Sequence, residues 1–113
     1  MKFKLTPNKA VAIRLAFVCW YTLIEWGCLD LNEKADQQEF ESRLKTITNF
    51  LLENYYREAD VNFYLGYMIS LCPWLFSEKV DEWESKAQDM LACAVRKEPA
   101  NAVYQMVYLA NRN

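Results

Sequence analysis

Apolar positions recur at helical spacing in successive segments of the chain, and polar residues typical of helix ends separate them. Thr6 followed by Pro7 indicates a helix start, and the first helix is expected to run to about Trp26 and to stop at Gly27. From Asp36 an ordinary amphipathic pattern begins, with an apolar stripe that favours a surface helix with one buried face. The stripe consists of Phe40, Leu44, Ile47, Leu51 and Tyr55.

Three shorter helices are expected in the second half of the chain. Asp60 is a suitable N-cap for the third helix, which has to end near Leu71 because Pro73 cannot continue it. Ser77 is the expected cap of a fourth helix, and Asn101 that of a fifth. No alternating strand pattern of useful length occurs, so the sequence predicts an all-α fold of about five helices stacked as antiparallel hairpins.

The length and composition of the chain point to one domain. With 113 residues, 53 % of them hydrophobic, the chain is long enough for one sizeable core and too short for two. A single helical domain over residues 1–113 is therefore expected.

Two segments are almost entirely apolar. In the first helix the polar residues fall on one narrow stripe and almost every other position is apolar, so this helix is expected to be buried on more than one side. The stripe is Arg14, Val18, Tyr21, Thr22 and Glu25. Residues 61–77 carry no charge. Their first part is expected to form a central helix that is covered on both faces, and Trp74, Leu75 and Phe76 lie in the connection that follows this helix. These three side chains are expected to fold back over the hairpin, with a partner contact as the alternative.

Charge is unevenly distributed, although the net charge is only −2. Four basic groups and no acid occur in residues 1–14. Two groups of acidic residues follow. An acidic face repels nucleic acid and attracts basic proteins. The alternative interpretation is that each group is a solvated helix face. The first group includes Asp30, Glu33 and Asp36, and the second is Glu78, Asp81, Glu82 and Glu84.

The sequence does not predict an enzyme. The chain has no histidine and two glycines, so histidine-based mechanisms and a glycine-rich phosphate loop are both excluded. Asp36, Glu39 and Glu41 are not spaced as a calcium loop, and no cofactor or metal is expected. The four cysteines form no C-x-x-C pair and are expected to be free thiols, with disulfides as the alternative if the protein were extracellular.

A cytosolic protein with no membrane partner is expected. The uncharged run in residues 61–77 is shorter than the roughly 20 residues that span a bilayer. Residues 15–24 resemble the core of a signal peptide, but Arg14 and Glu25 flank the run closely and no small-residue cleavage site follows.

Small residues in the third and fourth helices predict close packing of the two. Gly66 in mid-helix indicates a close neighbour, and Ala87, Leu91, Ala94 and Pro99 follow at steps of four, three and five. This pattern resembles the second helix of a tetratricopeptide repeat. It departs from the repeat by nine residues between Gly66 and Ala87, so residues 73–83 are expected to be an inserted loop. One and a half repeats do not make a solenoid, and the first two helices are expected to supply the missing layer.

Residues 60–111 also resemble small cytosolic helical proteins encoded beside bacterial contact-dependent inhibition systems or other polymorphic toxins. LGYMISLCPWLF and MLACAVRKEPANAVYQMVYLAN carry this resemblance, which implies an immunity protein that neutralises a cognate toxin. The acidic groups would suit a basic nuclease domain as the partner. The expected contact residues are Glu78, Asp81, Glu82 and Glu84 with Trp74 as an anchor, and Asp30, Glu33 and Asp36 as a second surface.

An adaptor or chaperone is the alternative function, with a peptide held between stacked helices. Tyr64, Tyr67, Tyr104 and Tyr108 would line the groove, although tyrosines at helical spacing are commonly core packing.

Overall fold

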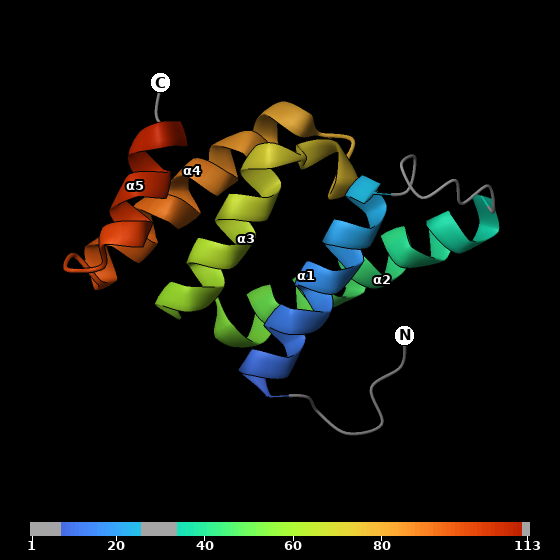
Figure 1. Ribbon diagram of the computed structural model, residues 1–113, viewed down its shortest axis with the longest axis horizontal. Coiled ribbons are helices and arrows are strands. Elements are labelled where there is room, and N and C mark those ends of the chain that lie inside the picture. The colour runs from blue at the N-terminus through green and yellow to red at the C-terminus, as the bar shows by residue number, and fades with distance from the viewer. Residues whose placement is uncertain (1–7, 26–33, 112–113) are drawn as a thin grey trace. The chain divides into compact units, whose positions relative to one another are not determined.

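The computed structural model describes residues 8–25 and 34–111, and within these ranges the chain is helical with no strand (Figure 1). The all-α prediction is therefore confirmed. The elements are α1 (Lys9–Glu25), α2 (Lys34–Tyr55), α3 (Ala59–Leu71), the 3-10 turn η1 (Pro73–Leu75), α4 (Val80–Lys97) and α5 (Ala102–Asn111). They belong to two compact units, 1–54 and 55–113. The single domain expected over residues 1–113 stays a prediction.

Helices α1 and α2 make up the first unit. Asn8 caps α1, because its side-chain Oδ1 accepts a hydrogen bond of 2.8 Å from the Val11 N–H. The predicted limits at Thr6, Trp26 and Gly27 lie outside the described residues. In α2 the apolar stripe behaves as predicted, since Leu44, Ile47 and Leu51 have no exposed surface.

The expectation that α1 is buried on more than one side is wrong. One face is buried, and the opposite face exposes five large hydrophobic side chains together with Arg14. The buried residues are Ala12, Ala16, Cys19, Trp20 and Leu23, and the exposed ones are Val11, Phe17, Val18, Tyr21 and Ile24. The rings of Phe17 and Tyr21 stack with centroids 6.3 Å apart, so two of these exposed side chains pack against each other on α1.

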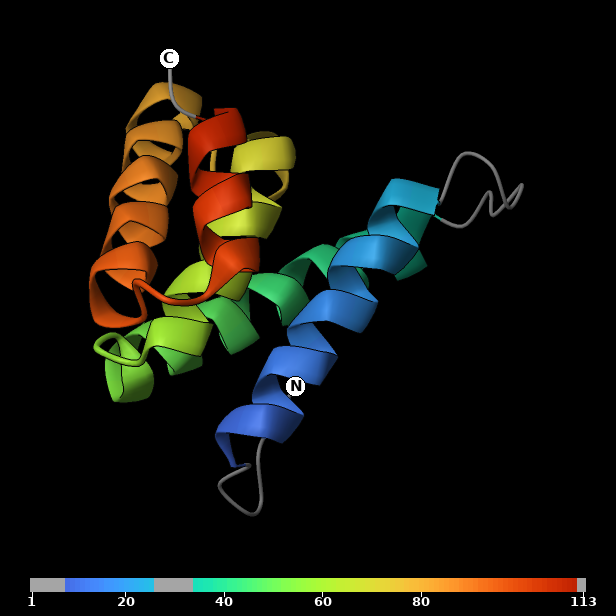
Figure 2. The ribbon, with the colours of Figure 1, turned by 60° about the vertical axis from the view of Figure 1, so that its left-hand side comes forward.

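Helices α3, α4 and α5 form the second unit and follow one another as antiparallel neighbours (Figures 1 and 2). Short connections produce this arrangement, since eight residues separate α3 from α4 and include η1, and four separate α4 from α5. The predicted inserted loop over residues 73–83 is correct only in its first part. Val80 already begins α4, so the last four residues of that segment are its first turn.

Gly66 sets the distance between α3 and α4. A Cβ atom at this position would lie 3.0 Å from Leu91 Cγ and 3.2 Å from the backbone oxygen of Ala87. Ala87, Leu91 and Ala94 are fully buried on the facing side of α4. The predicted close approach at Gly66 is therefore confirmed.

An aromatic pair joins α3 to α5. The rings of Phe63 and Tyr104 stack with centroids 4.4 Å apart, and both side chains are buried with Leu91 and Ala94. Most of the α3 circumference is buried, and Tyr64 and Leu71 are its exposed large side chains. The prediction of a covered central helix holds apart from that narrow stripe.

Two predicted N-caps are each wrong by two residues. The N-cap of α3 is Glu58, and Asp60 lies inside the first turn, where its Oδ1 accepts from the Val61 N–H. The N-cap of α4 is Lys79, and the Ser77 hydroxyl accepts from the Lys79 N–H two residues on, which stabilises a turn before the helix.

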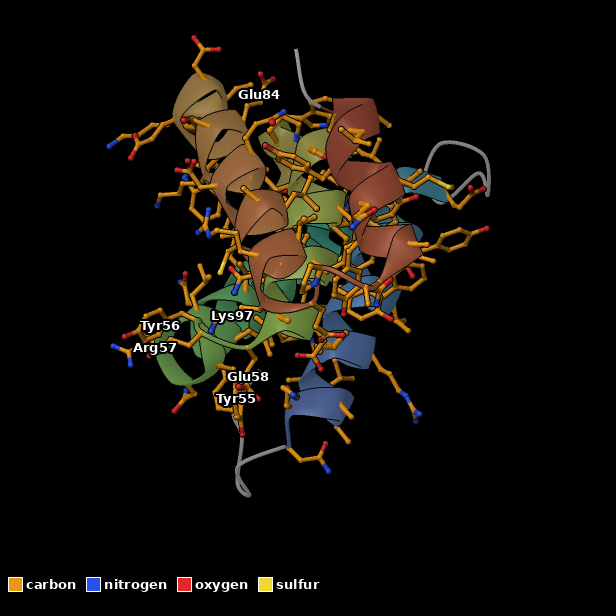
Figure 3. The ribbon with its side chains drawn as sticks, turned by 90° about the vertical axis from the view of Figure 1, so that its left-hand side faces the viewer. Tyr55, Tyr56, Arg57, Glu58, Glu84 and Lys97 are labelled. Atoms are coloured by element: carbon orange, nitrogen blue, oxygen red, sulfur yellow. The ribbon has the colours of Figure 1, made fainter. Side chains whose placement is uncertain are left out.

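The turn that enters α3 is held by polar contacts from two directions. Asn62, which is buried, donates from its amide to the carbonyls of Tyr56 and Glu58 at 2.8 and 2.9 Å. The ammonium group of Lys97, in the last turn of α4, donates to the carbonyl of Arg57 (Figure 3). These bonds fix where α3 begins, and so explain the two-residue error in its predicted cap.

Asn101→Ala is expected to lower the free energy of unfolding by about 1 kcal/mol. The Asn101 side-chain oxygen accepts from the Tyr104 N–H at 3.1 Å, as the predicted cap requires, and alanine leaves that donor without its bond. Urea denaturation followed by circular dichroism measures the change. Asn49→Ala, at an exposed position inside α2, is the control, and an equal loss in both variants would contradict the capping role.

Candidate functional site

The second acidic group lies at the start of α4. Glu78 precedes the helix, Asp81 and Glu82 are in its first turn, Glu84 follows, and all four side chains are exposed. Acidic residues near a helix N-terminus interact favourably with the helix dipole, and Arg96 and Lys97 complement it in the last turn. The acidic residues at the start of α4 and the basic residues at its end therefore help to stabilise the helix, apart from any role in binding.

The helical repeat places the three of these acids that belong to α4, namely Asp81, Glu82 and Glu84, on different sides of the helix. At about 100° per residue, Asp81 and Glu84 are about 60° apart, whereas Glu82 lies about 160° from Glu84. The four acidic residues predicted as one surface are therefore not one surface. Asp81 and Glu84 form a pair, and Glu82 lies on another flank of the helix.

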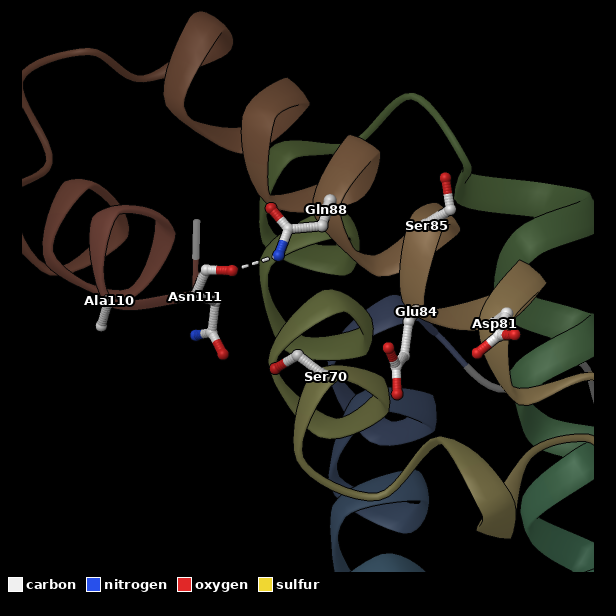
Figure 4. Close-up of a pocket in the computed structure, with 7 residues that line it drawn as sticks. All are labelled: Ser70, Asp81, Glu84, Ser85, Gln88, Ala110 and Asn111. Carbon is white, nitrogen blue, oxygen red and sulfur yellow. Dashed lines mark hydrogen bonds between the residues drawn. The ribbon is translucent and has the colours of Figure 1, made fainter. Parts of the chain in front are cut away.

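Asp81 and Glu84 line an open pocket of about 530 Å³. Figure 4 shows Asp81, Glu84 and Gln88 along α4, with Ser70 of α3 and Asn111 of α5 nearby. The remaining lining residues are Ser85 and Ala110. All three helices of the second unit contribute, so the position of the pocket depends on their packing.

Hydrogen bonds within the pocket fix its polar lining. The Gln88 amide donates to the backbone carbonyl of Asn111, and the Asn111 amide donates to the Val107 carbonyl at 2.9 Å. The Ser70 hydroxyl donates to the Tyr67 carbonyl at 2.8 Å. The two carboxylates are thus the charged groups of a pocket whose other side chains are neutral, an arrangement that suits an incoming cationic group.

Sequence reasoning did not find Ser70, Ser85, Gln88 or Asn111. Gln88 lies four residues after Glu84 and seven after Asp81, so the helical repeat could have placed it beside them. No local signal connects Ser70 and Asn111 to this pair, because tertiary packing brings α3 and α5 to α4.

The connection before α4 is partly buried, as predicted, and partly exposed. Pro73 and Phe76 are buried, and the Phe76 ring stacks on that of Trp83 with centroids 6.3 Å apart. The fold-back is thus confirmed for Phe76. Trp74, which was expected to fold back with it, is 64 % exposed, since its side chain leaves η1 on the solvent side.

Two lysines partly compensate the negative charge of the acidic residues at the start of α4. Lys79 and Lys86 are both exposed, and the Lys86 ammonium nitrogen lies 4.6 Å from the centroid of the Trp83 ring. This cation–π contact orients Lys86 along α4. The candidate site is therefore narrower than the sequence indicated and consists of Asp81, Glu84 and their pocket, with Trp74 exposed on the preceding turn.

The second predicted surface cannot be placed in the same way. Asp30 and Glu33 lie outside the described residues, and so does the side chain of Asp36, whose backbone is in the first turn of α2.

The four tyrosines of the alternative groove have different environments. Tyr104 is 8 % exposed and packs on Phe63, and Tyr108 packs against the same buried cluster. Tyr67 stacks with Phe63 at 6.3 Å, and Tyr64 is exposed. These contacts are core packing for three of the four residues.

The remaining chemical groups offer few reactive possibilities. Burial raises the pKa of the Cys72 thiol and, against the opposing charge of Arg43, that of the Cys19 thiol, so both are poorer nucleophiles at neutral pH. In the first unit, a 2.7 Å hydrogen bond from Arg43 lowers the pKa of exposed Glu39. Among residues 8–25 and 34–111, no group of three His, Cys, Asp or Glu side chains is placed to hold a metal ion.

The fold and the site define an all-α protein with an open acidic pocket on a three-helix unit. Nothing in the described part of the chain is a helix with both the length and the apolar composition needed to cross a bilayer. No family model, curated protein or solved structure matches the chain.

Proposed function

We propose that this chain is an immunity protein, a binding module that neutralises a cognate toxin by covering its active site or substrate surface. The proposal rests on the resemblance of residues 60–111 to immunity proteins of contact-dependent inhibition and other polymorphic toxin systems. The arrangement of α3, α4 and α5, with Gly66 against Leu91, is also compatible with the packing that the resemblance to a tetratricopeptide repeat implies.

The pocket formed by Asp81 and Glu84 is the observation that carries the proposal. Two carboxylates and the neutral side chains of Ser70, Gln88 and Asn111 would accept a lysine or arginine side chain of a basic partner. A basic nuclease domain carries such side chains on the surface that binds its substrate. When this basic surface binds the pocket, the chain would exclude the nucleic acid sterically and would compete with it for the same positive charges.

Trp74 is the proposed anchor of the complex. Tryptophan is enriched among the residues that dominate binding energy at interfaces, and here its side chain is exposed on the turn that precedes the acidic residues. Complementary charge would accelerate association, and burial of the indole would slow dissociation.

Affinity purification from the source cell tests this proposal. The tagged protein serves as bait, and mass spectrometry identifies the proteins retained after a high-salt wash. Stoichiometric recovery of a single basic toxin domain would support the immunity function. Recovery of many cytosolic proteins in small, salt-sensitive amounts would contradict it.

A peptide-binding adaptor is the second candidate. Tyr64 and Leu71 favour it, because these exposed side chains are seven residues apart on one face of α3 and could contact an extended peptide. Titration with a peptide library tests it, and one extended motif with micromolar affinity would favour the adaptor over the immunity protein.

A further inference from the structure

Helix α1 is apolar on the face that it buries and also on the opposite face, where a helix of a water-soluble domain normally carries polar residues. The exposed large side chains of that opposite face are Val11, Phe17, Val18, Tyr21 and Ile24, each of them 40 % to 57 % exposed. Val11 and Ile24 bound the face and are about 140° apart around the helix axis. We call this surface the outer face.

Arg14 lies near the middle of the outer face. Val18 and Tyr21 follow it by four and seven residues, which places them about 40° and 20° from it around the axis. Arg14 is exposed, and its guanidinium forms no ion pair with any residue in the described part of the chain. An occupant of the outer face therefore has to accept apolar groups and a positive charge together.

Charge narrows the choice of occupant further. Residues 1–14 contain four basic residues and no acid, and the one acid within α1 is its last residue, Glu25. The four basic residues are Lys2, Lys4, Lys9 and Arg14. The basic partner proposed for the pocket would be repelled here, and a second copy of the chain would bring four further basic residues with it. An uncharged apolar segment would leave Arg14 without a counter-charge.

The width of the outer face favours a lipid surface over a second helix. A packed helix contacts a narrow ridge of its neighbour, so a helix seated on Val18 and Tyr21 would leave Val11 or Ile24 exposed. A lipid surface is deformable and covers the whole arc. Acyl chains accommodate the aliphatic side chains, the ring of Tyr21 suits the headgroup level, and a lipid phosphate binds the Arg14 guanidinium.

We propose that the chain binds the surface of an anionic membrane through α1, which lies parallel to the bilayer with its outer face in the interfacial region. The Arg14 guanidinium reaches the lipid phosphates while its aliphatic stem stays beside the apolar side chains. Such a helix requires neither a spanning segment nor a signal peptide, the two features on which the expectation of no membrane partner rests. Binding is reversible and weakens with salt, because part of it is attraction to the negative membrane surface.

Co-sedimentation with lipid vesicles tests the proposal. One set of vesicles is phosphatidylcholine alone, and the other contains about 30 % phosphatidylglycerol. The partition coefficient is expected to be at least about 30-fold higher on the anionic vesicles at about 0.05 M salt and to fall steeply at about 0.5 M salt. Equal partitioning onto the two sets, or no binding to either, would overturn the proposal.

Two variants separate the apolar and the charged contributions. Val18→Gln, Tyr21→Gln keeps the charge and is expected to lower partitioning onto anionic vesicles about 10-fold, because two apolar contacts are lost. Arg14→Gln keeps the apolar side chains and is expected to lower it about 5-fold on anionic vesicles and to leave it unchanged on neutral ones.

The matched control removes comparably exposed apolar side chains from another helix. Val103→Gln, Met106→Gln changes two such residues in α5, a helix without charged side chains, and should leave vesicle binding unchanged. Circular dichroism verifies that every variant keeps its helix content. Equal losses in the two double variants would mean that any exposed apolar residue contributes, which would overturn the assignment to α1.

Two further measurements identify a different occupant. Sedimentation equilibrium without vesicles is expected to give the mass of a monomer, and a doubled mass that Val18→Gln, Tyr21→Gln abolishes would assign the outer face to a second copy. Affinity purification is expected to recover the same proteins with this variant as with the unmodified bait. Loss of an acidic protein from the variant alone would assign the face to that protein. Either result would overturn the membrane proposal.

Discussion

Gly66→Val is expected to lower the free energy of unfolding by about 3 kcal/mol. The new Cβ alone would lie 3.0 Å from Leu91 Cγ and 3.2 Å from the Ala87 oxygen, and valine adds two methyl groups beyond it. The Leu91 side chain is completely buried, and the Ala87 oxygen belongs to the backbone of α4, so α3 and α4 have to move apart. Urea denaturation followed by circular dichroism measures the loss.

A double-mutant cycle with Leu91 distinguishes overpacking from other effects at Gly66. Gly66→Ala is expected to cost about 1 kcal/mol, since a gain of about 1 kcal/mol in helix propensity offsets part of the steric cost. Leu91→Ala opens space beside this position, so adding Gly66→Ala to it should restore part of the stability that Leu91→Ala removes. If Gly66→Val were as stable as the unmodified protein, or if the two sites were strictly additive, the close contact would not limit the packing.

The Asp81→Lys, Glu84→Lys double variant is expected to weaken binding to the proposed basic partner by about 100-fold at low salt. The two side chains share the pocket, and their reversal changes its charge by four units while Ser70, Gln88 and Asn111 remain. Titration of the recovered partner at several salt concentrations measures the effect. The salt dependence should become flatter, because attractive charge pairs are lost.

Glu78→Lys, Glu82→Lys is the matched control. It changes the net charge by the same four units at two exposed positions that do not line the pocket, so it should weaken binding by less than about 10-fold. Equal losses in the two double variants would mean that the overall charge around α4 matters and the pocket does not. Unchanged binding in the first variant would remove Asp81 and Glu84 from the interface.

The helices were predictable because their signals are local. A three- and four-residue stripe located α2, Pro73 ended α3, and Asn101 caps α5 through its own side chain. Gly66 was informative because glycine in mid-helix is costly unless a neighbour needs the space. The cap of α3 was missed because Asn62 also holds the preceding turn through the carbonyl of Tyr56, six residues earlier, a contact that no helical spacing rule contains.

The surfaces were less predictable than the helices. Nearly every position of α1 is apolar, so hydropathy could not separate its buried Trp20 from its exposed Tyr21. The four acids at the start of α4 are close in sequence, but the helical repeat separates Glu82 from Glu84 within the helix. Asn111 joins the pocket only because α5 packs beside α4, and that placement depends on the whole three-helix unit.

The bond from Lys97 to the Arg57 carbonyl has a consequence for limited proteolysis. Trypsin recognises arginine and would cut the peptide bond after Arg57, close to the boundary between the two compact units. That carbonyl is held by the last turn of α4, and Asn62 holds the carbonyls on either side of it. A protease needs an extended, free segment of chain. Trypsin is therefore expected to cut slowly after Arg57, although its side chain is exposed, as long as α4 stays folded to its end. The rate of cutting at this bond therefore reports on fraying at Lys97, forty residues further along the chain.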